Sequence, residues 1–187
     1  AGMEGVDVVG IAQTGTGKTA AFMIPALEKI KAGGGLQVVV LCPTRELAQQ
    51  VCEDTEVLAK GTTVRAQSIF GGVGYGPQIT ALDEGWEIIV ATPGRFIDHM
   101  QQGRVNLSKV EYLVLDEADR MLDMGFRPQI EQAMRGMPSS RQTMLFSATM
   151  PHGVHDLALR ITKEAVWIEA TPPGTTAEGV TEIFYSV

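Results

Sequence analysis

The sequence predicts an α/β fold, a three-layer α/β/α domain with a mostly parallel central sheet. Short apolar runs alternate with helical patterns along the chain, which is the order that a doubly wound sheet requires. Some runs, such as Val38–Leu41, are apolar at every position, as expected of a strand that helices cover on both faces. The length of 187 residues fits one domain with its own core.

Each predicted strand is a short apolar run that a helical pattern or turn residues separate from the next. The strands are expected at 6–11, 38–42, 65–70, 88–91, 112–115, 144–146 and 166–168. The pattern is weakest at 65–70. Because ligands of such sheets bind beyond the carboxyl ends of the strands, we expect the chemistry at that edge.

The predicted helices fill the gaps between these strands. They are expected at 18–31, 46–60, 77–83, 95–102, 127–134 and 152–161. Pro25 is expected to bend the first helix. In the second, Leu47, Val51 and Leu58 have the spacing of one apolar face.

Composition and charge narrow the classes of function. Cys42 and Cys52 form no CxxC pair or His/Cys cluster, so we expect reduced thiols in a cytoplasmic protein. No run of eighteen apolar residues predicts a membrane span, and no leader pattern is found at the start. The formal net charge of −7 disfavours binding of nucleic acid by bulk electrostatics, so any such contact must be local. We expect a monomer.

Residues 171–187 are expected to be an extended linker after a domain of residues 1–170. The stretch 171–179 is rich in Pro, Gly and Thr, and 180–187 alternates apolar and polar residues. The chain also starts almost directly in a strand pattern. Together these features suggest part of a longer protein.

A glycine-rich loop at 12–19 is the strongest chemical signal. It reads AQTGTGKT, lies between a predicted strand and a predicted helix, and matches the phosphate-loop pattern GxxxxGK[ST] apart from Ala12. Amides at a helix start attract phosphate, Lys18 should reach the β- and γ-phosphates, and Thr19 should hold Mg²⁺. The predicted nucleotide-binding residues are Ala12, Gln13, Thr14, Gly15, Thr16, Gly17, Lys18 and Thr19. The alternative, a plain glycine turn with an exposed lysine, fits the GKT ending poorly.

An apolar strand at 112–115 ends in acidic residues. Charges directly after a buried strand are costly unless they lie at the active edge. Asp116 is placed to hold Mg²⁺, and Glu117 to act as general base on the attacking water, so Lys18, Asp116 and Glu117 form the predicted catalytic set. The alternatives are a helix N-cap cluster and a metal-only site, and the second lacks histidine and EF-hand spacing.

These motifs and others in the same order resemble the first lobe of the DEAD-box RNA helicase family. The motifs are AQTGTGKT at 12–19, PTRELA at 43–48, Gly71-Gly72, TPGR at 92–95, DEAD at 116–119 and SAT at 147–149. The resemblance extends from about residue 5 to 151 and implies a RecA-like fold, with ATP and Mg²⁺ as cofactors. It implies an ATP-dependent RNA helicase that hydrolyses ATP and remodels RNA duplexes together with a second lobe.

The resemblance also implies that three motif loops face the RNA backbone. The residues concerned are Pro43, Thr44, Arg45, Gly71, Gly72, Thr92, Pro93, Gly94 and Arg95. Thr44 and Gly94 are expected just before helices whose free amides would bind phosphate, and Arg45 and Arg95 would add charge. Such binding reads the backbone rather than the base sequence. Taken singly, the motifs are equally typical of a capped helix start, a turn and a loop.

The hydroxyls of Ser147 and Thr149 could reach Asp119 or Asp116. The resemblance implies that they couple the nucleotide state to the RNA side. The alternative is that they cap the helix predicted at 152–161.

Two parts of the family pattern are not found in this sequence: the upstream adenine-recognising segment with its glutamine, and the second lobe with its arginines. An arginine finger contributes roughly 10³–10⁵ in rate, so we expect this chain alone to bind ATP weakly and to hydrolyse it hardly at all. Other hypotheses are another superfamily 2 nucleic-acid-dependent ATPase, such as a DNA translocase, and a scaffold with vestigial ATPase motifs. The intact Lys18, Thr19, Asp116 and Glu117 disfavour the scaffold.

Overall fold

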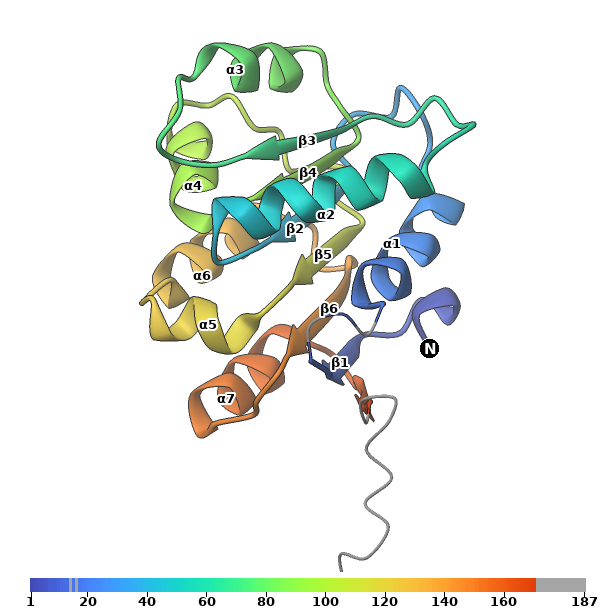
Figure 1. The fold of residues 1–187 in the computed structure, drawn as a ribbon, viewed down its shortest axis with the longest axis vertical. Helices are drawn as coiled ribbons and strands as arrows, with labels where there is room; N and C mark the ends of the chain where they lie inside the picture. The colour runs from blue at the N-terminus through green and yellow to red at the C-terminus, as the bar shows by residue number, and fades with distance from the viewer. Residues whose placement is uncertain (14, 16, 171–187) are drawn as a thin grey trace, which may run out of the picture.

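A seven-stranded, all-parallel sheet forms the centre of the fold (Figure 1). The computed structural model describes residues 1–13, 15 and 17–170. The strands are β1 (Val8–Ile11), β2 (Val38–Leu41), β3 (Ala66–Ile69), β4 (Ile88–Ala91), β5 (Tyr112–Leu115), β6 (Gln142–Ser147) and β7 (Val166–Glu169). They lie in the order β3-β4-β2-β5-β6-β1-β7. All the predicted strands are confirmed, including the weak one at β3. The predicted linker at 171–187 lies outside the described residues.

Most of the predicted helices are confirmed, and the structure contains one helix that was not predicted. They are α1 (Lys18–Lys29), α2 (Arg45–Leu58), α3 (Gly76–Asp83), α4 (Pro93–Gln101), α5 (Ala118–Asp123), α6 (Arg127–Arg135) and α7 (His152–Ile161), with a 3₁₀ turn, η1 (Gly2–Glu4). The six-residue α5 was not predicted. Helix α4 begins at Pro93 rather than Arg95, because proline has no N–H to lose at the first position of a helix.

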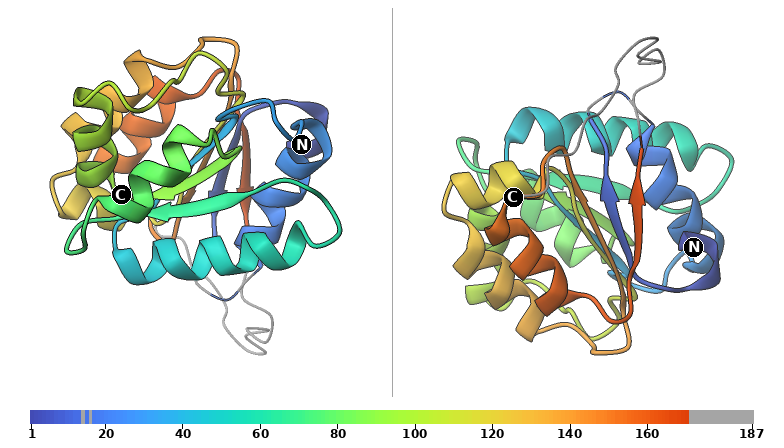
Figure 2. Two further views of the ribbon diagram at one scale, coloured as in Figure 1. Left: turned by 90° about the horizontal axis from the view of Figure 1, so that it is seen from above. Right: turned by 90° about the horizontal axis from the view of Figure 1, so that it is seen from below.

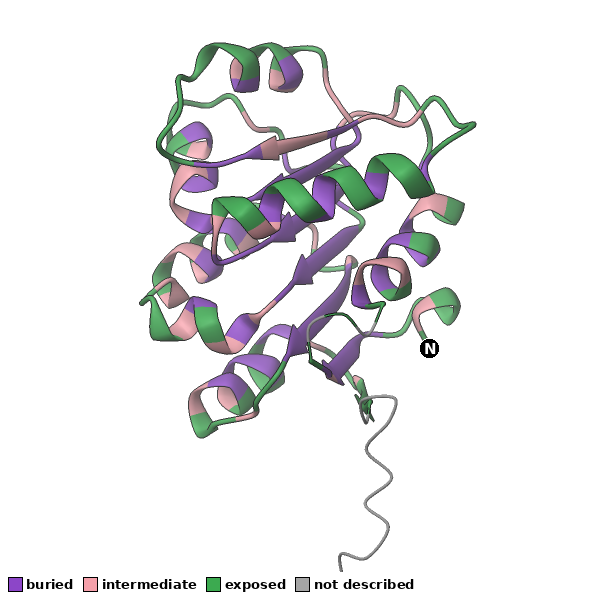
Figure 3. Cartoon of the chain, viewed as in Figure 1, coloured by how far each residue is buried: buried purple, intermediate pink, exposed green. Residues whose placement is uncertain are grey.

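Helices cover both faces of the sheet, as the apolar strands predicted (Figure 2). Helices α1 and α2 pack on one face and α4 to α7 on the other, while α3 lies beside β3 at the sheet edge. Strand β2 is an example. Val38 and Val40 pack in the core under α1 and α2, and Val39 and Leu41 pack in the core under α4 to α7. In Figure 3 the central strands are accordingly buried along their length. Within the described part of the chain, no helix is long and apolar enough to cross a membrane.

The buried face of α2 differs from the predicted one. Its buried residues are Ala48, Val51, Cys52 and Thr55, and their small side chains let the helix lie close to β3 and β4. Leu47, Val51 and Leu58 do lie on one side of the helix, as predicted, since all three line the pocket described below, but Leu58 is 36% exposed at its end. A helix face that lies close against a sheet favours small residues over large apolar ones.

Gly10 in β1 leaves room for the ring of Phe146 on the neighbouring strand β6. A Cβ atom at position 10 would lie 2.6 Å from Phe146 Cδ1. The Phe146 ring is buried and packs against Phe22, with 5.6 Å between ring centroids, so it has little space to move.

We expect Gly10→Ala to lower the free energy of unfolding by about 1–3 kcal/mol, because it overpacks this contact. Urea denaturation measures the change. Gly74→Ala is the matched control, since a Cβ atom there would meet nothing within 4 Å. Equal stability of the two variants would show that the Phe146 ring moves aside without cost.

Candidate functional site

The carboxyl edge of the sheet brings the predicted motifs together in a definite order. The strand order places the loops after β3, β4 and β2 side by side, and these carry Gly71-Gly72, TPGR and PTRELA. The loops after β5, β6 and β1 follow, and they carry DEAD, SAT and the phosphate loop. The edge therefore has a predicted RNA half and a predicted nucleotide half in direct continuity.

A pocket of about 310 Å³ lies in the nucleotide half. Lys18 and Thr19 at the start of α1 and Asp116 and Glu117 after β5 all line it. Gly15, Gly17 and Ala20 also line it, and the opposite wall is the side of α2 that carries Leu47, Gln50, Val51, Asp54, Val57 and Leu58. The glycine-lysine-threonine turn and the acidic pair, almost a hundred residues apart in the sequence, thus meet at one cavity.

The phosphate loop has the backbone that its glycines predicted. Gly15 and Gly17 have φ values of +83° and +81°, in the left-handed region that favours glycine. Gly17 is also the N-cap of α1 and makes no side-chain cap, so the first amides of the helix remain available. Ala12 is buried and donates its N–H to Ser147 O at 2.9 Å. Gln13 is exposed, and Thr14 and Thr16 lie outside the described residues.

Lys18 and Asp116 form a buried ion pair across the pocket. Lys18 Nζ lies 3.5 Å from Asp116 Oδ1 and donates to Ala12 O at 3.2 Å. Burial raises the pKa of Asp116, Lys18 lowers it, and the neighbouring Glu117 raises it again, with a net rise. Burial, with Asp116 and Glu117 nearby, likewise raises the pKa of the Cys42 thiol. The pocket is therefore lined by an ammonium and a carboxyl group that are both largely buried from solvent.

Glu117 has a strained backbone. Its φ of 51° and ψ of 53° place a residue with a Cβ atom in the left-handed region, at a cost of roughly 1–2 kcal/mol. The Glu117 N–H donates to Asp116 Oδ1 at 3.0 Å, and its side chain, 16% exposed, lies 3.4 Å from Arg120 Nη1. This conformation turns the chain from β5 into α5 and brings Glu117 to the pocket wall. Strain of this kind concentrates at functional sites.

Asp119 joins the acidic loop to the SAT loop. Its N–H donates to Ser147 Oγ at 3.1 Å, and its Oδ2 accepts from Thr149 Oγ1 at 2.7 Å and from Thr149 N at 3.0 Å. Helix α7 has Pro151 as its N-cap and no side-chain cap, so the helix-capping alternative for Ser147 and Thr149 was wrong. Both side chains instead bind Asp119, one of the two partners expected.

Replacing Thr149 by valine should raise the pKa of Asp119. Burial by itself would raise this pKa, but the hydrogen bonds from Thr149, Arg120 and Ser147 together hold it below its ordinary value. The contribution of Asp119 to stability is therefore present above the unfolded pKa of about 3.9, and is lost as the pH falls through the lower folded value. A carboxyl-carbon NMR titration measures the shift.

Thr80→Val is the control for this substitution. It also removes an exposed threonine hydrogen bond, from Thr80 Oγ1 to Gly76 O, but lies on α3. The Asp119 pKa should stay unchanged in Thr80→Val. An unchanged Asp119 pKa in Thr149→Val would show that the hydroxyl contact does not persist in solution.

In the loop after β2, Thr44 directly precedes a helix, as predicted. Pro43 is buried, and Thr44 Oγ1 accepts from Leu47 N at 3.3 Å, which caps α2. Arg45 is half exposed and pairs with Glu46, with 2.9 Å between Nε and Oε1. A Cβ atom built on Gly72 would lie 3.9 Å from Arg45 Nη1, so the two predicted RNA loops are neighbours. Gly71 and Gly72 are both exposed.

The TPGR loop departs from its prediction in two respects. Gly94 lies inside the first turn of α4 rather than before it, and Thr92 is the N-cap. Arg95, expected to add charge toward RNA, turns inward with only 9% of its side chain exposed. Its Nη1 donates to Val73 O at 3.1 Å. Sequence reasoning missed this because the acceptor lies 22 residues away in the chain.

Comparisons with known proteins agree with this arrangement. The family model for DEAD/DEAH box helicases matches residues 1–157. The chain is 49% identical over 162 residues to the ATP-dependent RNA helicase DBP2 of Chaetomium thermophilum, which covers 83% of this chain and 29% of that protein. The dbp2 protein of Neurospora crassa is 48% identical over the same length and with the same coverage. The chain thus spans less than a third of these relatives.

A solved structure supports the same assignment. The crystal structure of a DEAD box protein from Methanococcus jannaschii superposes with a TM-score of 0.86 and 40% sequence identity. The match covers 90% of this chain and 46% of that one. The sheet is therefore of the RecA-like kind found in DEAD-box proteins. With a family match over most of its length and the motifs gathered at one edge of the sheet, the chain belongs to the DEAD/DEAH box helicase family.

Proposed function

We propose that the chain is the ATP-binding first lobe of an ATP-dependent RNA helicase. The observation that carries the proposal is the one pocket that Lys18, Thr19, Asp116 and Glu117 share, on the same sheet edge as loops with exposed residues at Gly71, Gly72 and the start of α2. Residues 1–170 make up the lobe, and 171–187 lead on to a second one. The related ATP-dependent RNA helicases are about three times as long as this chain, which supports the need for more protein.

The pocket suits a magnesium-bound triphosphate. The positive-φ glycines leave space beside the loop, since a Cβ atom on Gly15 or Gly17 would meet nothing within 4 Å. The Lys18 ammonium would bind phosphate oxygens. The Thr19 hydroxyl and the Asp116 carboxylate are hard oxygen ligands of the kind Mg²⁺ prefers.

Magnesium here would depend on the nucleotide. No cluster of three or more His, Cys, Asp or Glu residues suited to a metal occurs among residues 1–13, 15 and 17–170. Mg²⁺ commonly takes one or two protein ligands together with phosphate oxygens and water. When bound, it would neutralise charge on the phosphates, while Glu117 would accept a proton from the attacking water.

RNA would bind to the other half of the edge. The starts of α2 and α4 offer amides at the positive end of a helix, and Arg45 adds an exposed cation. The other backbone contacts would come from the predicted residues of the three loops: Pro43, Thr44, Gly71, Gly72, Thr92, Pro93 and Gly94. A net charge of −7 then matters little, because the contacts are local and read phosphate and sugar.

The contact of Asp119 with Ser147 and Thr149 joins two loops of the nucleotide half and would pass the nucleotide state on toward the RNA half. These residues connect the loop after β5 to the loop after β6, beside the pocket. A shift of the acidic loop on nucleotide binding would therefore be passed to the SAT loop.

The buried thiols of Cys42 and Cys52 support a reducing compartment such as the cytoplasm, and we propose a monomer.

The decisive experiment compares RNA with DNA as activators of ATP hydrolysis by the longer protein that carries this lobe. We expect stimulation by single-stranded RNA and little by DNA of the same sequence. Equal stimulation would favour another superfamily 2 nucleic-acid-dependent ATPase. We also expect residues 1–187 alone to bind ATP weakly and turn it over hardly at all. Robust RNA-stimulated turnover by this chain would contradict the need for a second lobe.

A further inference from the structure

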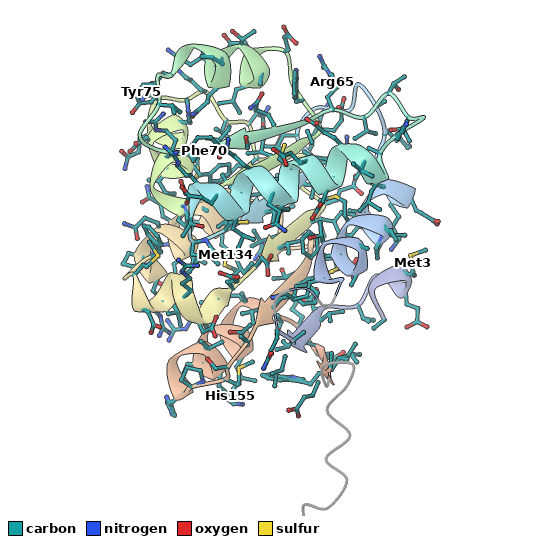
Figure 4. The ribbon with its side chains drawn as sticks, viewed as in Figure 1. Met3, Arg65, Phe70, Tyr75, Met134 and His155 are labelled. Carbon is teal, nitrogen blue, oxygen red and sulfur yellow. The ribbon has the colours of Figure 1, made fainter. Side chains whose placement is uncertain are left out.

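A cluster of polar and aromatic side chains, away from the pocket, ties the glycine loop after β3 to helix α4. It consists of Tyr75, Gln78, Arg95, Asp98 and His99, and we call it the Gln78 cluster. Tyr75 and Gln78 come from the loop and α3, and the other residues come from α4. Figure 4 labels Tyr75 and Phe70, which mark the two ends of this loop. Nothing in the proposed nucleotide chemistry requires these contacts.

Gln78 is the centre of the cluster. Its side chain is almost fully buried, and its Nε2 donates to Phe70 O at 3.0 Å. Its Oε1 accepts from Arg95 Nη1 at 3.3 Å and contacts His99 Nε2 at 3.0 Å. Because a backbone carbonyl only accepts, the amide orientation is fixed, and His99 must be the donor through Nε2. One glutamine therefore holds the end of β3 and two residues of α4.

His99 is held neutral in this role. Burial lowers its pKa, and the nearby Arg95 lowers it further. A proton on Nδ1 would find no acceptor, since this buried atom has no hydrogen-bond partner in the described structure. At neutral pH His99 therefore acts as a fixed donor to Gln78, with a neutral ring beside the Arg95 cation.

Arg95 holds the middle of the loop. Its Nη1 donates to Val73 O, and its guanidinium lies 4.0 Å from the centre of the Tyr75 ring. The Tyr75 ring in turn meets the His99 ring edge-on at 5.3 Å. Arg95 Nε also lies 3.8 Å from Asp98 Oδ2. The cation thus has partners within the protein on several sides.

The loop needs such a clamp because of its composition. Gly71, Gly72, Gly74 and Gly76 fall within six residues, and glycine loses more backbone freedom on ordering than any other residue. A loop that is already ordered binds its ligand more tightly, because binding then loses no further backbone entropy. The Gln78 cluster orders this loop before any ligand arrives.

We propose that Gln78 and His99 are positioning residues for RNA binding, which hold Arg95 inward and fix the Gly71-Gly72 loop beside the amino end of α4. Backbone amides from the two loops then face one phosphate backbone at a set spacing. Arg95 acts through the loop and not as a direct phosphate ligand. The inference rests on the proposed function, in which these loops face RNA.

The test measures RNA and ATP affinity of the 187-residue chain in parallel. The chain is titrated into a fluorescein-labelled oligouridine of about ten nucleotides at about 50 and 200 mM salt. The fall in RNA affinity between the two salt concentrations reports the number of phosphate contacts. We expect His99→Leu to weaken RNA binding about tenfold, the effect of one lost buried hydrogen bond, with ATP affinity unchanged. His99→Gln, which keeps a donor amide, should restore most of the affinity. His152→Leu, at a histidine whose side chain is 90% exposed, is the matched control.

A second variant separates positioning from direct contact. Arg95→Gln should weaken RNA binding while leaving the salt slope unchanged, whereas loss of a direct phosphate contact would lower the slope by about 1. Should His99→Leu not fold, Tyr75→Leu replaces it, because Tyr75 is partly exposed and its loss removes the ring under Arg95.

The outcomes are distinct. A folded His99→Leu with wild-type RNA affinity, or a lower salt slope in Arg95→Gln, would overturn the positioning role while the proposed function stands. Absence of any salt-dependent RNA binding by the wild-type chain at low salt would overturn the proposed function, and the inference with it. Weakened RNA binding together with an equal loss of ATP affinity would show a general structural defect and would also overturn the inference.

Discussion

Replacing Lys18 by alanine should lower the affinity for ATP about 100-fold or more, the largest binding effect of any single substitution in the pocket. Removing one partner of a buried charge contact costs about 2–5 kcal/mol, and about 1.4 kcal/mol corresponds to a factor of ten. Lys18 is 9% exposed and lines the pocket. No other described cation lines the pocket to take over its role.

The same substitution should change Asp116. Lys18 lowers the pKa of this buried carboxyl more than any other group does, so without Lys18 the pKa rises further above its ordinary value. A carboxyl that holds its proton more strongly is a weaker ligand for Mg²⁺, so the loss should be larger for the magnesium complex of ATP than for ATP alone.

Affinity is best measured with a fluorescent ATP analogue on the protein that carries both lobes, with and without magnesium. Lys29→Ala, in the last turn of the same helix, is the matched control and should leave the affinity nearly unchanged. Wild-type affinity in Lys18→Ala would mean that the ammonium does not contact the phosphates, and that the buried pair with Asp116 serves the fold alone.

The sequence was sufficient for the sheet and for the order of the loops along its edge. Strands such as β2 and β4 are buried on both faces, which leaves an uninterrupted apolar run that needs no tertiary information to recognise. The rule that parallel strands bind ligands at their carboxyl ends then brings Lys18 and Asp116 to the same edge. Both lie at one pocket, although the sequence alone contains no distance between them.

What could not be predicted depends on contacts between distant residues. Helix α5 has six residues, too few to show a helical period, and the left-handed conformation of Glu117 is imposed by the turn that joins β5 to α5. The inward turn of Arg95 requires Val73 and Gln78, which are far from it in sequence. Gln78 itself has the appearance of an ordinary surface residue in a short helix. Only the packing of α3 and α4 reveals it as buried.

Glu117→Gln should leave ATP binding nearly intact and lower RNA-stimulated hydrolysis by roughly 10²–10⁴-fold, the usual contribution of a general base. Glutamine has the same length and can keep a contact to Arg120, but it cannot accept a proton from water. Because the strained backbone is the same for both residues, the unfolding temperature should not change, which separates lost chemistry from lost structure.

The measurement again uses the protein with both lobes, comparing steady-state hydrolysis with ATP affinity. Asp123→Asn is the matched control, since it also replaces a carboxylate by an amide, but at an exposed position at the end of α5 that does not line the pocket. Its hydrolysis rate should match the wild type. If Glu117→Gln hydrolyses ATP at the wild-type rate, the base is another group, and the strain at Glu117 serves only to turn the chain into α5.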